Sequence, residues 1–280
     1  MKKLLSLSLA VLSSLSLTLT AHAQEGAINV VSREDGSGTR GAFVELVEVT
    51  DEAGDDLTTL SAIIQNSTNG VLQTVAGDAN AIGYVSLGSL NDDVKALKID
   101  GVEATSETIL DGEYKIARPF NLAWKKDSLS DLSKDFLAFI HSTQGQAIVE
   151  EEGFIQSKQE QEEYTGKDQE GTIEVVGSTS VTPVLEKLAE AYQEINPGVT
   201  INITSNGSSA GLESAAQGVA DLGMSSRELK DEEKENLDFD AIALDGIAVI
   251  VHKDSSLEDI TLENVRKIFL GELVDWEEVK

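Results

Sequence analysis

The chain has 280 residues, of which 40% are hydrophobic and 25% charged, so it is long enough for one large globular domain or two smaller ones. Its 50 acidic residues outnumber its 21 Lys and Arg residues and give a formal net charge of -29. This excess argues against nucleic-acid binding, because phosphate backbones are bound by clusters of cationic side chains. The chain has no cysteine and only three histidines, so disulfides, thiolate metal sites and cysteine nucleophiles are excluded, and a histidine-rich metal centre is not expected.

Residues 1–23 have the pattern of a secretory signal peptide. Lys2 and Lys3 precede an apolar run rich in Leu and Ser, which ends in the small-residue cleavage pattern Ala21-His22-Ala23. A retained membrane anchor is the alternative, but no stop-transfer segment follows. We therefore expect cleavage after Ala23 and an exported protein, periplasmic or secreted. Without cysteine, the chain has no residue for lipid attachment.

After residue 24, strand-like and helix-like stretches alternate along the chain. Short runs rich in β-branched residues predict buried strands over residues 28–31, 62–66, 173–176, 200–204 and 246–252. Apolar residues at three-to-four spacing predict amphipathic helices over residues 135–149, 184–195 and 261–273. This alternation favours an α/β architecture with largely parallel sheets. The polar segment 156–171 is the best candidate for a linker.

An internal repeat is visible in the middle of the chain. Residues 66–86 align without gaps on residues 206–226, at a constant offset of 140 positions. Five pairs are identical: Asn66/Asn206, Leu72/Leu212, Ala76/Ala216, Gly83/Gly223 and Ser86/Ser226. The predicted elements around the two segments also follow in the same order, which favours two related lobes. Two lobes imply a cleft between them, where small ligands usually bind.

Three turns of glycine and hydroxyl residues lead from a predicted strand into a predicted helix; they lie at 32–39, 177–182 and 205–210. A helix N-terminus has unpaired N–H groups and the positive end of the helix dipole, so it can bind an anion in an acidic protein. Each turn alone is explained as an ordinary helix cap. The three turns together, with Arg33 and Asp35, favour an anion site. Arg33 could bind two oxygens of an oxyanion, and Asp35 would either orient Arg33 or accept a hydrogen bond from a protonated anion.

A serine hydrolase is the alternative from another functional class. Residues 207–211 match the pattern G-x-S-x-G, with Ser209 at the nucleophile position, and Asp245 and His252 follow in the order of a hydrolase triad. His252 ends an apolar strand pattern, however, where a core or capping role accounts for it. The sequence contains no P-loop with its lysine. We expect no metal and no cofactor.

Five of these segments together resemble the phosphate-binding protein of the bacterial Pst-type ABC transporter. They are SREDGSGTRGAF, GSTSV, SNGSSAG, DLGMSSREL and IFLGELVDWEEVK, and the resemblance covers nearly all of the chain after residue 24. The order of the segments differs from the usual family member, in which the segment similar to GSTSV comes first. The resemblance therefore implies a two-lobed periplasmic-binding-protein (type II) fold in circularly permuted form, with the linker 156–171 joining the former termini.

The permuted order implies one discontinuous lobe, residues 26–118 plus 247–280, and one continuous lobe, residues 119–246. The chain would cross between the lobes near 118–124 and 244–252, which are the hinge candidates. The family does no chemistry on its ligand. The resemblance implies capture of inorganic phosphate and its delivery to the membrane permease subunits of an ABC transporter, by a monomer. Another oxyanion, such as sulfate or molybdate, and a phosphate sensor without transport remain as alternatives.

The resemblance also implies which residues contact the anion. They are Arg33, Asp35, Ser37, Gly38 and Thr39 from one lobe, and Thr179, Ser180, Ser208 and Ser226 from the other. Many family members have an aspartate at the position of Ser226, and that aspartate accepts the proton of phosphate. Serine at this position leaves Asp35 as the acidic acceptor and leaves the selectivity against sulfate open. Arg227 could bind the anion or pair with a carboxylate, and we expect pairing.

Overall fold

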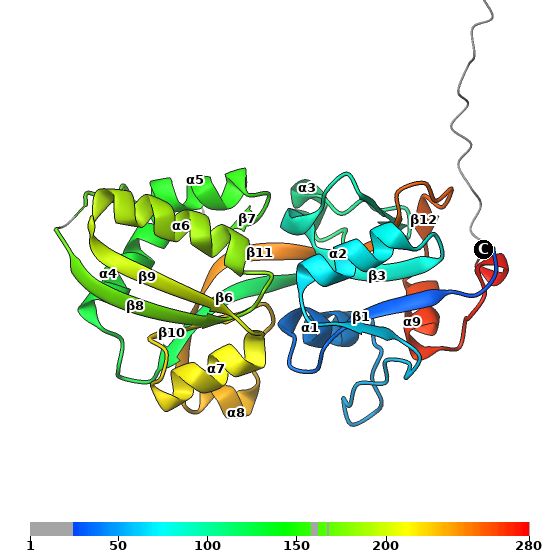
Figure 1. Cartoon of the computed structure of the whole chain (residues 1–280), viewed down its shortest axis with the longest axis horizontal. Coiled ribbons are helices and arrows are strands. Elements are labelled where there is room, and N and C mark those ends of the chain that lie inside the picture. The colour runs from blue at the N-terminus through cyan, green and yellow to red at the C-terminus, as the bar shows by residue number, and fades with distance from the viewer. Residues whose placement is uncertain (1–24, 158–161, 167, 280) are drawn as a thin grey trace, which may run out of the picture.

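The structure is a computed structural model that describes residues 25–157, 162–166 and 168–279. The expected signal peptide and part of the expected linker lie outside the described residues. Among the residues described, no helix combines the length and the apolar character needed to cross a membrane. Two α/β halves lie side by side and are connected by two long strands, β6 and β11, that run through the middle of the molecule (Figure 1).

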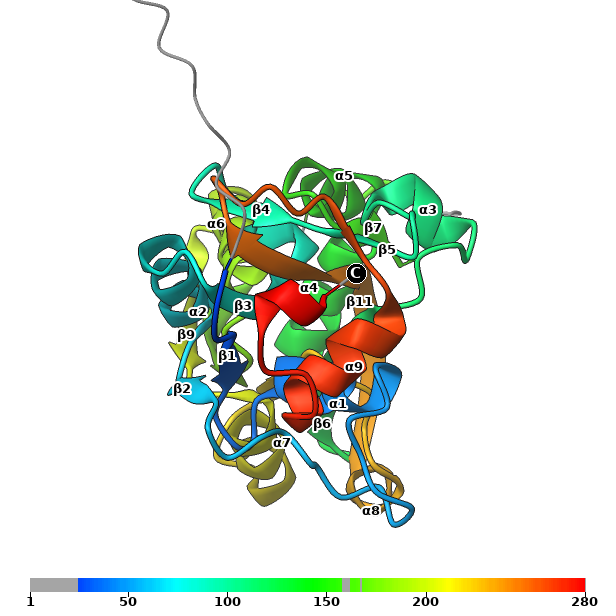
Figure 2. The same cartoon turned by 90° about the vertical axis from the view of Figure 1, so that its right-hand side faces the viewer.

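The half on the right of Figure 1, called the α1 half, is formed by both ends of the described chain. Its elements are β1 (Asn29–Arg33), α1 (Gly38–Leu46), β2 (Ile63–Gln65), α2 (Thr68–Gly77), β3 (Ala81–Ser86), η1 (Leu87–Ser89), β4 (Val94–Ala96), β5 (Lys98–Ile99), α3 (Ser106–Leu110), β12 (Asp259–Ile260), α9 (Leu262–Leu270) and η2 (Trp276–Glu278). Figure 2, which faces this half, shows α2 and α9 on opposite sides of strands β1 and β3.

The half on the left of Figure 1, called the α6 half, is formed by the middle of the chain. Its elements are α4 (Asp131–Ile140), α5 (Thr143–Glu151), β7 (Ile155–Gln156), β8 (Glu170–Gly177), α6 (Thr182–Ile195), β9 (Gly198–Ser205), α7 (Ser208–Gln217), β10 (Leu222–Ser225) and α8 (Asp231–Lys234). The strands β6 (Ala117–Lys125) and β11 (Leu237–His252) connect the halves.

One sheet runs through both halves in the strand order β2-β1-β3-β11-β6-β10-β8-β9. The pairs β1–β2, β1–β3, β8–β9 and β8–β10 are parallel, whereas β3–β11, β11–β6 and β6–β10 are antiparallel. The expectation of a largely parallel sheet is therefore wrong at the centre. The reason is topological, since the chain enters the α6 half along β6 and returns along β11 in the opposite direction.

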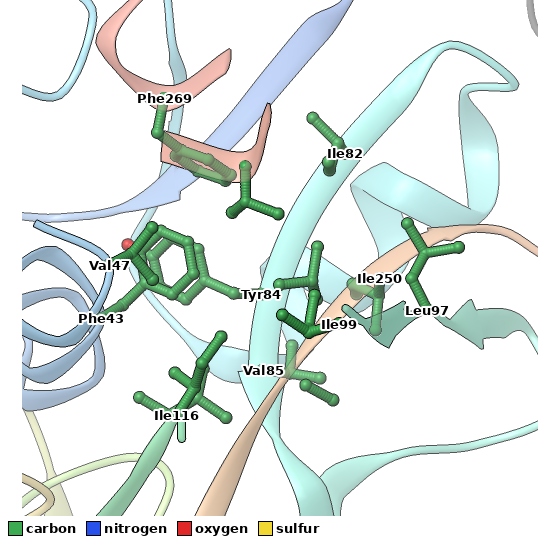
Figure 3. Close-up of a cluster of buried hydrophobic side chains, with 14 of the residues drawn as sticks. Phe43, Val47, Ile82, Tyr84, Val85, Leu97, Ile99, Ile116, Ile250 and Phe269 are labelled. Carbon is green, nitrogen blue, oxygen red and sulfur yellow. The ribbon is translucent and has the colours of Figure 1, made fainter. Parts of the chain in front are cut away.

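Each half has its own hydrophobic core. In the α1 half, the ring of Tyr84 stacks on Phe43 with centroids 4.0 Å apart, and Phe269 meets Phe43 edge-on at 4.7 Å (Figure 3). The core of the α6 half includes Phe136 and Tyr192. The strands β6 and β11, which pass between the halves, contribute residues to both cores.

Three predicted elements differ in the structure, one of them the strand expected at 246–252, which is only the last part of β11. The helix expected over 135–149 is two helices, α4 and α5, because the Ser142 hydroxyl caps α5 by accepting a hydrogen bond from the Gly145 N–H at 3.2 Å. The apolar spacing continues through this break, so the sequence pattern conceals it. The strand expected to be buried at 62–66 is β2, an edge strand on which Ile63 and Ile64 are exposed.

The expected linker, residues 156–171, is shorter than predicted, because its ends belong to β7 and β8. Its middle is attached to the α6 half through Tyr164. The Tyr164 hydroxyl donates to a carboxylate oxygen of Asp135 at 2.6 Å and accepts from the side-chain amide of Asn196 at 3.1 Å. The segment therefore packs on α4 and α6 at this residue.

Candidate anion-binding site

Four helices begin at or near the junction of the two halves, where residues at their starts contact one another: α1 and α2 from one half, and α6 and α7 from the other. None of these four has an acidic residue in its first turn. By contrast, α3, α4, α8 and α9 each have at least one, although α5 also has none. In a chain with 50 acidic residues this difference matters, because a carboxylate in the first turn would occupy or repel an anion at the positive end of the helix. The four helix ends at the junction are therefore suited to hold an anion.

Hydroxyl groups from the two halves contact one another between these helix ends. Thr39, in the first turn of α1, lies 2.8 Å from Ser180, measured between hydroxyl oxygens. Thr68, the first residue of α2, lies 3.2 Å from Ser180 and 3.3 Å from Thr179. Ser180, Thr39 and Thr68 are buried. These hydroxyls can each donate and accept, so they can exchange their mutual hydrogen bonds for bonds to an oxyanion.

A second set of hydroxyls surrounds Ser226, which follows β10. The Ser226 hydroxyl accepts from Ser178 at 2.8 Å and lies 3.5 Å from the Ser208 hydroxyl. The Ser226 N–H also donates to the Ser208 hydroxyl at 3.1 Å. Gly38, at the start of α1, packs against Ser208 and Ser226 so closely that a β-carbon at this position would overlap both. The Gly38 backbone therefore joins this set from the opposite half.

Arg33, at the end of β1, is the arginine that reaches the first set of hydroxyls. Its side chain is only 3% exposed, and one terminal nitrogen donates to the Thr179 hydroxyl at 3.1 Å. Its Nε and the same terminal nitrogen also donate to the two carboxylate oxygens of Glu34, each at 2.8 Å. The carboxylate that orients Arg33 is therefore that of Glu34, so the first of the two roles expected of Asp35, orienting Arg33, is wrong. Asp35 is exposed, because the chain turns at Gly36, which has a φ of 83°.

Tyr84 positions the end of β1 that carries Arg33. Its hydroxyl lies 2.8 Å from the Ser32 hydroxyl and accepts from the Arg33 N–H at 3.2 Å. Burial raises the pKa of Tyr84 above its ordinary value of 10.0, so the phenol remains neutral near neutral pH. Since the ring is held by Phe43, the core of the α1 half fixes the backbone of Arg33.

A second buried arginine, Arg118, lies beside the hydroxyls. Its guanidinium donates to the Ser226 carbonyl at 2.7 Å and to a carboxylate oxygen of Asp245 at 3.0 and 3.2 Å. The other Asp245 oxygen accepts from the Ser86 hydroxyl at 2.8 Å. Burial lowers the pKa of Arg118 and raises that of Asp245, and the attraction between the two groups opposes both shifts.

The structure brings together most of the residues expected at the anion site. Arg33, Gly38, Thr39, Thr179, Ser180, Ser208 and Ser226 lie in the contacts described above. Ser37 is buried as the N-cap of α1, where its hydroxyl accepts from the Arg40 N–H at 3.3 Å. Four further residues contact these groups and were not predicted from the sequence: Thr68, Ser178, Glu34 and Arg118. The internal repeat could have identified Thr68, because it aligns with Ser208 at the offset of 140.

The three residues of the hydrolase alternative do not meet. Ser209 contacts Arg227, whose terminal nitrogen lies 3.4 Å from its hydroxyl. Asp245 bonds Arg118 and Ser86, and the Nδ1 atom of His252 accepts from the Asp254 N–H at 3.2 Å. Without a base at Ser209, this arrangement has no nucleophile–base pair. The expected pairing of Arg227 is confirmed, since it donates to both carboxylate oxygens of Glu233, at 2.7 and 2.8 Å.

A groove of about 910 Å³ opens beside these hydroxyls on the boundary of the two halves. Asp35, Ser37 and Arg40 line it from the α1 half, and Ser209 and Arg227 line it from the α6 half. Arg40 is paired with Asp56 at 2.6 Å, so both arginines of the groove are neutralised by a carboxylate. The groove leads from solvent to residues that directly adjoin Gly38 and Ser208.

The chain is similar to known proteins both in sequence and in fold. The model of the PBP superfamily domain matches residues 14–144 and 162–280. Phosphate-binding protein PstS 2 of Streptococcus pneumoniae serotype 4 is 50% identical over 289 residues, which cover 100% of this chain and 99% of that protein. A crystal structure of the phosphate-binding protein of a phosphate ABC transporter from Streptococcus pneumoniae TIGR4 matches with a TM-score of 0.75 and 53% identity, covering 91% of this chain and 100% of that one. The phosphate-binding protein PstS of Staphylococcus saprophyticus is 35% identical over 118 residues, 39% of this chain and 37% of that protein.

Proposed function

We propose a phosphate-capture function on one premise: the chain belongs to the PBP superfamily, in the family of PstS phosphate-binding proteins. Like the relatives that it matches, it is a solute-binding protein and not an enzyme. In our proposal the chain binds inorganic phosphate between its two halves and delivers it to the permease of a phosphate ABC transporter. The observation that carries the proposal is the buried set of hydroxyls and Arg33 between four helix ends free of acidic residues.

A tetrahedral oxyanion fits this arrangement chemically. Its oxygens would replace the hydrogen bonds that the hydroxyls make across the boundary, such as Thr39 to Ser180. Arg33 would add a charge-assisted hydrogen bond, the strongest single contribution in such a site. The proposed contacts are Arg33, Ser37, Gly38, Thr39, Thr68, Ser178, Thr179, Ser180, Ser208 and Ser226. Asp35 is assigned to the rim of the groove.

The two halves act as lobes in this proposal. One lobe comprises residues 26–118 plus 247–280 and the other residues 119–246, and the two hydrophobic cores follow this division except at residues such as Ile155, which packs in the core of the α1 half. Only β6 and β11 would need to bend for the lobes to separate, because few residues suffice for a hinge. Separation would widen the groove beside Ser37 and Ser209 and expose the site to solvent.

We also propose that the chain is a circular permutant of the usual family member. Two contacts support this order, because they place the two ends of the described chain beside each other: the Ile28 N–H donates to the Val274 carbonyl at 2.8 Å and the Trp276 N–H to the Gly26 carbonyl at 2.9 Å. A chain joined at this point and opened at the linker would keep its packed contacts. The partial match to the Staphylococcus saprophyticus protein is also what rotated sequences produce in a sequential alignment.

The proposal also covers the export of the chain and its protein partners. We infer that residues 1–23 are a signal peptide cleaved after Ala23, and that the exported monomer meets permease subunits at the membrane surface. Two lobes that close on the anion would present a different outer surface when loaded. The permease could then recognise the loaded form, because a partner responds only to states that differ in their contacts with it.

The test is calorimetric titration of residues 24–280, stripped of bound anion, with phosphate, sulfate and molybdate in separate experiments. We expect tight binding of phosphate with one site per chain. Tighter binding of sulfate or molybdate would assign the site to that oxyanion instead. If none of the three anions binds, the four helix N-termini are ordinary helix caps and the proposal is overturned.

A further inference from the structure

A buried ion pair lies where the chain passes between the two halves. Arg118 on β6 and Asp245 on β11 are directly opposite each other in the register of these antiparallel strands. Their side chains are 2% and 0% exposed, and the ion pair measures 3.0 Å. The Arg118 guanidinium also lies over the ring of Phe120, 5.3 Å from its centroid. The pair therefore spans the two strands at the proposed hinge.

Each member of the pair bonds a different half of the molecule. Asp245 accepts from the Ser86 hydroxyl at the end of β3, in the α1 half. Arg118 donates to the Ser226 carbonyl, which follows β10 in the α6 half. Ser86 and Ser226 are one of the identical pairs of the internal repeat. The ion pair thus connects equivalent positions of the two halves.

Stability alone does not account for a charged pair at this position. Removing two charges from water is costly, and an apolar pair of similar size is often as stable or more stable. The neighbouring core positions, among them Ile116, Phe120 and Ile247, are apolar and fully buried. An ion pair differs from an apolar pair because its hydrogen bonds fix the orientation of the groups that it contacts. Arg118 holds the Ser226 carbonyl, and the N–H of the same residue donates to the Ser208 hydroxyl.

We propose that Arg118 and Asp245 are positioning residues of the anion site, which hold Ser226 and Ser86 in a fixed relation across the hinge and so couple lobe closure to anion binding. In this proposal β6 and β11 bend beside the pair when the lobes separate, so the ion pair keeps the geometry described here only while the lobes are closed. Neither residue needs to touch the anion for this role. The inference rests on the proposed function, since it concerns the same site.

The test uses a double variant that removes both charges and keeps the polar groups, Arg118→Gln with Asp245→Asn. We expect its dissociation constant for phosphate to rise by about tenfold, the size of a typical coupling between sites. Ser86→Ala removes one hydrogen bond to the pair and leaves the charges in place. We expect it to weaken phosphate binding by about threefold. If the double variant does not fold, the phosphate affinity of Ser86→Ala alone tests whether the ion pair positions the anion site.

Asp135→Asn is the matched control, since Asp135 is a buried acid of the α6 half that bonds Tyr164 and Tyr192. We expect a lower unfolding temperature and phosphate affinity within about twofold of the parent, because the change lies outside the site. If the double variant and Ser86→Ala also bind phosphate within this margin, the pair is only structural and the proposal is overturned.

A distance measurement reports on closure directly. The chain has no cysteine, so Lys187→Cys and Lys267→Cys give a unique pair of spin-label positions, one exposed on each half. With phosphate, the parent should show one short distance and the double variant an additional longer one. If the parent binds no phosphate, the proposed function fails. The spin-label distances measured without ligand then test the hinge role of the ion pair separately. A broader distribution in the double variant would support the hinge role, and identical distributions would overturn it.

Discussion

Gly38 at the start of α1 lies directly against the Ser208 hydroxyl at the start of α7. A β-carbon at Gly38 would overlap this hydroxyl and come within 2.7 Å of the Ser226 hydroxyl, so the two helix ends meet only because residue 38 has no side chain. We predict that Gly38→Ala weakens phosphate binding by about tenfold or more, because overlap across the boundary opposes closure. Calorimetric titration measures the effect.

Gly77→Ala is the control for this substitution. Gly77 ends α2, and a β-carbon there would meet nothing within 4 Å. We expect it to leave phosphate affinity unchanged. Equal affinities for the Gly38 and Gly77 variants would contradict the close approach of the two helix ends as a condition for binding.

Arg33→Gln should remove most of the phosphate affinity. The substitution deletes the buried guanidinium that reaches Thr179 and leaves Glu34 without its partner. We expect the dissociation constant to rise by about a hundredfold, since hydrogen bonds to charged groups are the strong ones and the remaining carboxylate repels the anion.

Arg266→Gln controls for the loss of an arginine in the same half. Arg266 is partly exposed on α9, and its Nε donates to the Glu48 carbonyl at 2.9 Å. Binding should be unaffected by this change. If both variants bound phosphate as the parent does, Arg33 would have no place in the site.

Ser226→Asp should sharpen the discrimination between phosphate and sulfate. An ionised carboxylate only accepts hydrogen bonds, so it can accept one from the P–OH group of hydrogen phosphate but repels sulfate, which has no such donor at neutral pH. We expect the ratio of phosphate to sulfate affinity to rise by about tenfold or more relative to the parent. Competition titrations measure this ratio in both proteins. An unchanged ratio would mean that a group other than residue 226 sets the selectivity.

Glu233 should give a pH-dependent contribution to stability. Burial acts to raise its pKa, but hydrogen bonds from Arg227 and from the Lys230 N–H outweigh burial, so the pKa lies below its ordinary value of 4.5. A carboxylate whose pKa is lower in the folded state stabilises the fold above its unfolded pKa, and this contribution disappears as the pH falls through the folded pKa.

The measurement compares urea unfolding of the parent and Glu233→Gln over a range of pH. We expect the parent to be more stable near neutral pH and the difference to shrink as the pH falls below 4.5. Glu232→Gln, an exposed position of the same helix, should show no such change. A difference that does not depend on pH would contradict the pairing of Glu233 with Arg227.

The local pattern of the sequence was sufficient for much of the site. The turns at 32–39, 177–182 and 205–210 were predicted from glycine, hydroxyl residues and the following apolar spacing. These turns depend on interactions between residues close in the chain, namely caps and helix starts. The internal repeat indicated two similar halves for the same reason, since equivalent local patterns form equivalent elements.

Tertiary structure alone decided which groups meet. Glu34 and Asp35 are neighbours in the sequence, and only the direction of the chain at Gly36 places Glu34 on Arg33 and leaves Asp35 exposed. Arg118 and Asp245 are 127 residues apart and no sequence motif links them, so their contact follows from the register of β6 on β11. Sequence patterns reflect the preferences of neighbouring residues for a helix, a strand or a turn within one segment. The pairing of distant side chains depends on how the two halves pack, which is a property of the folded chain as a whole.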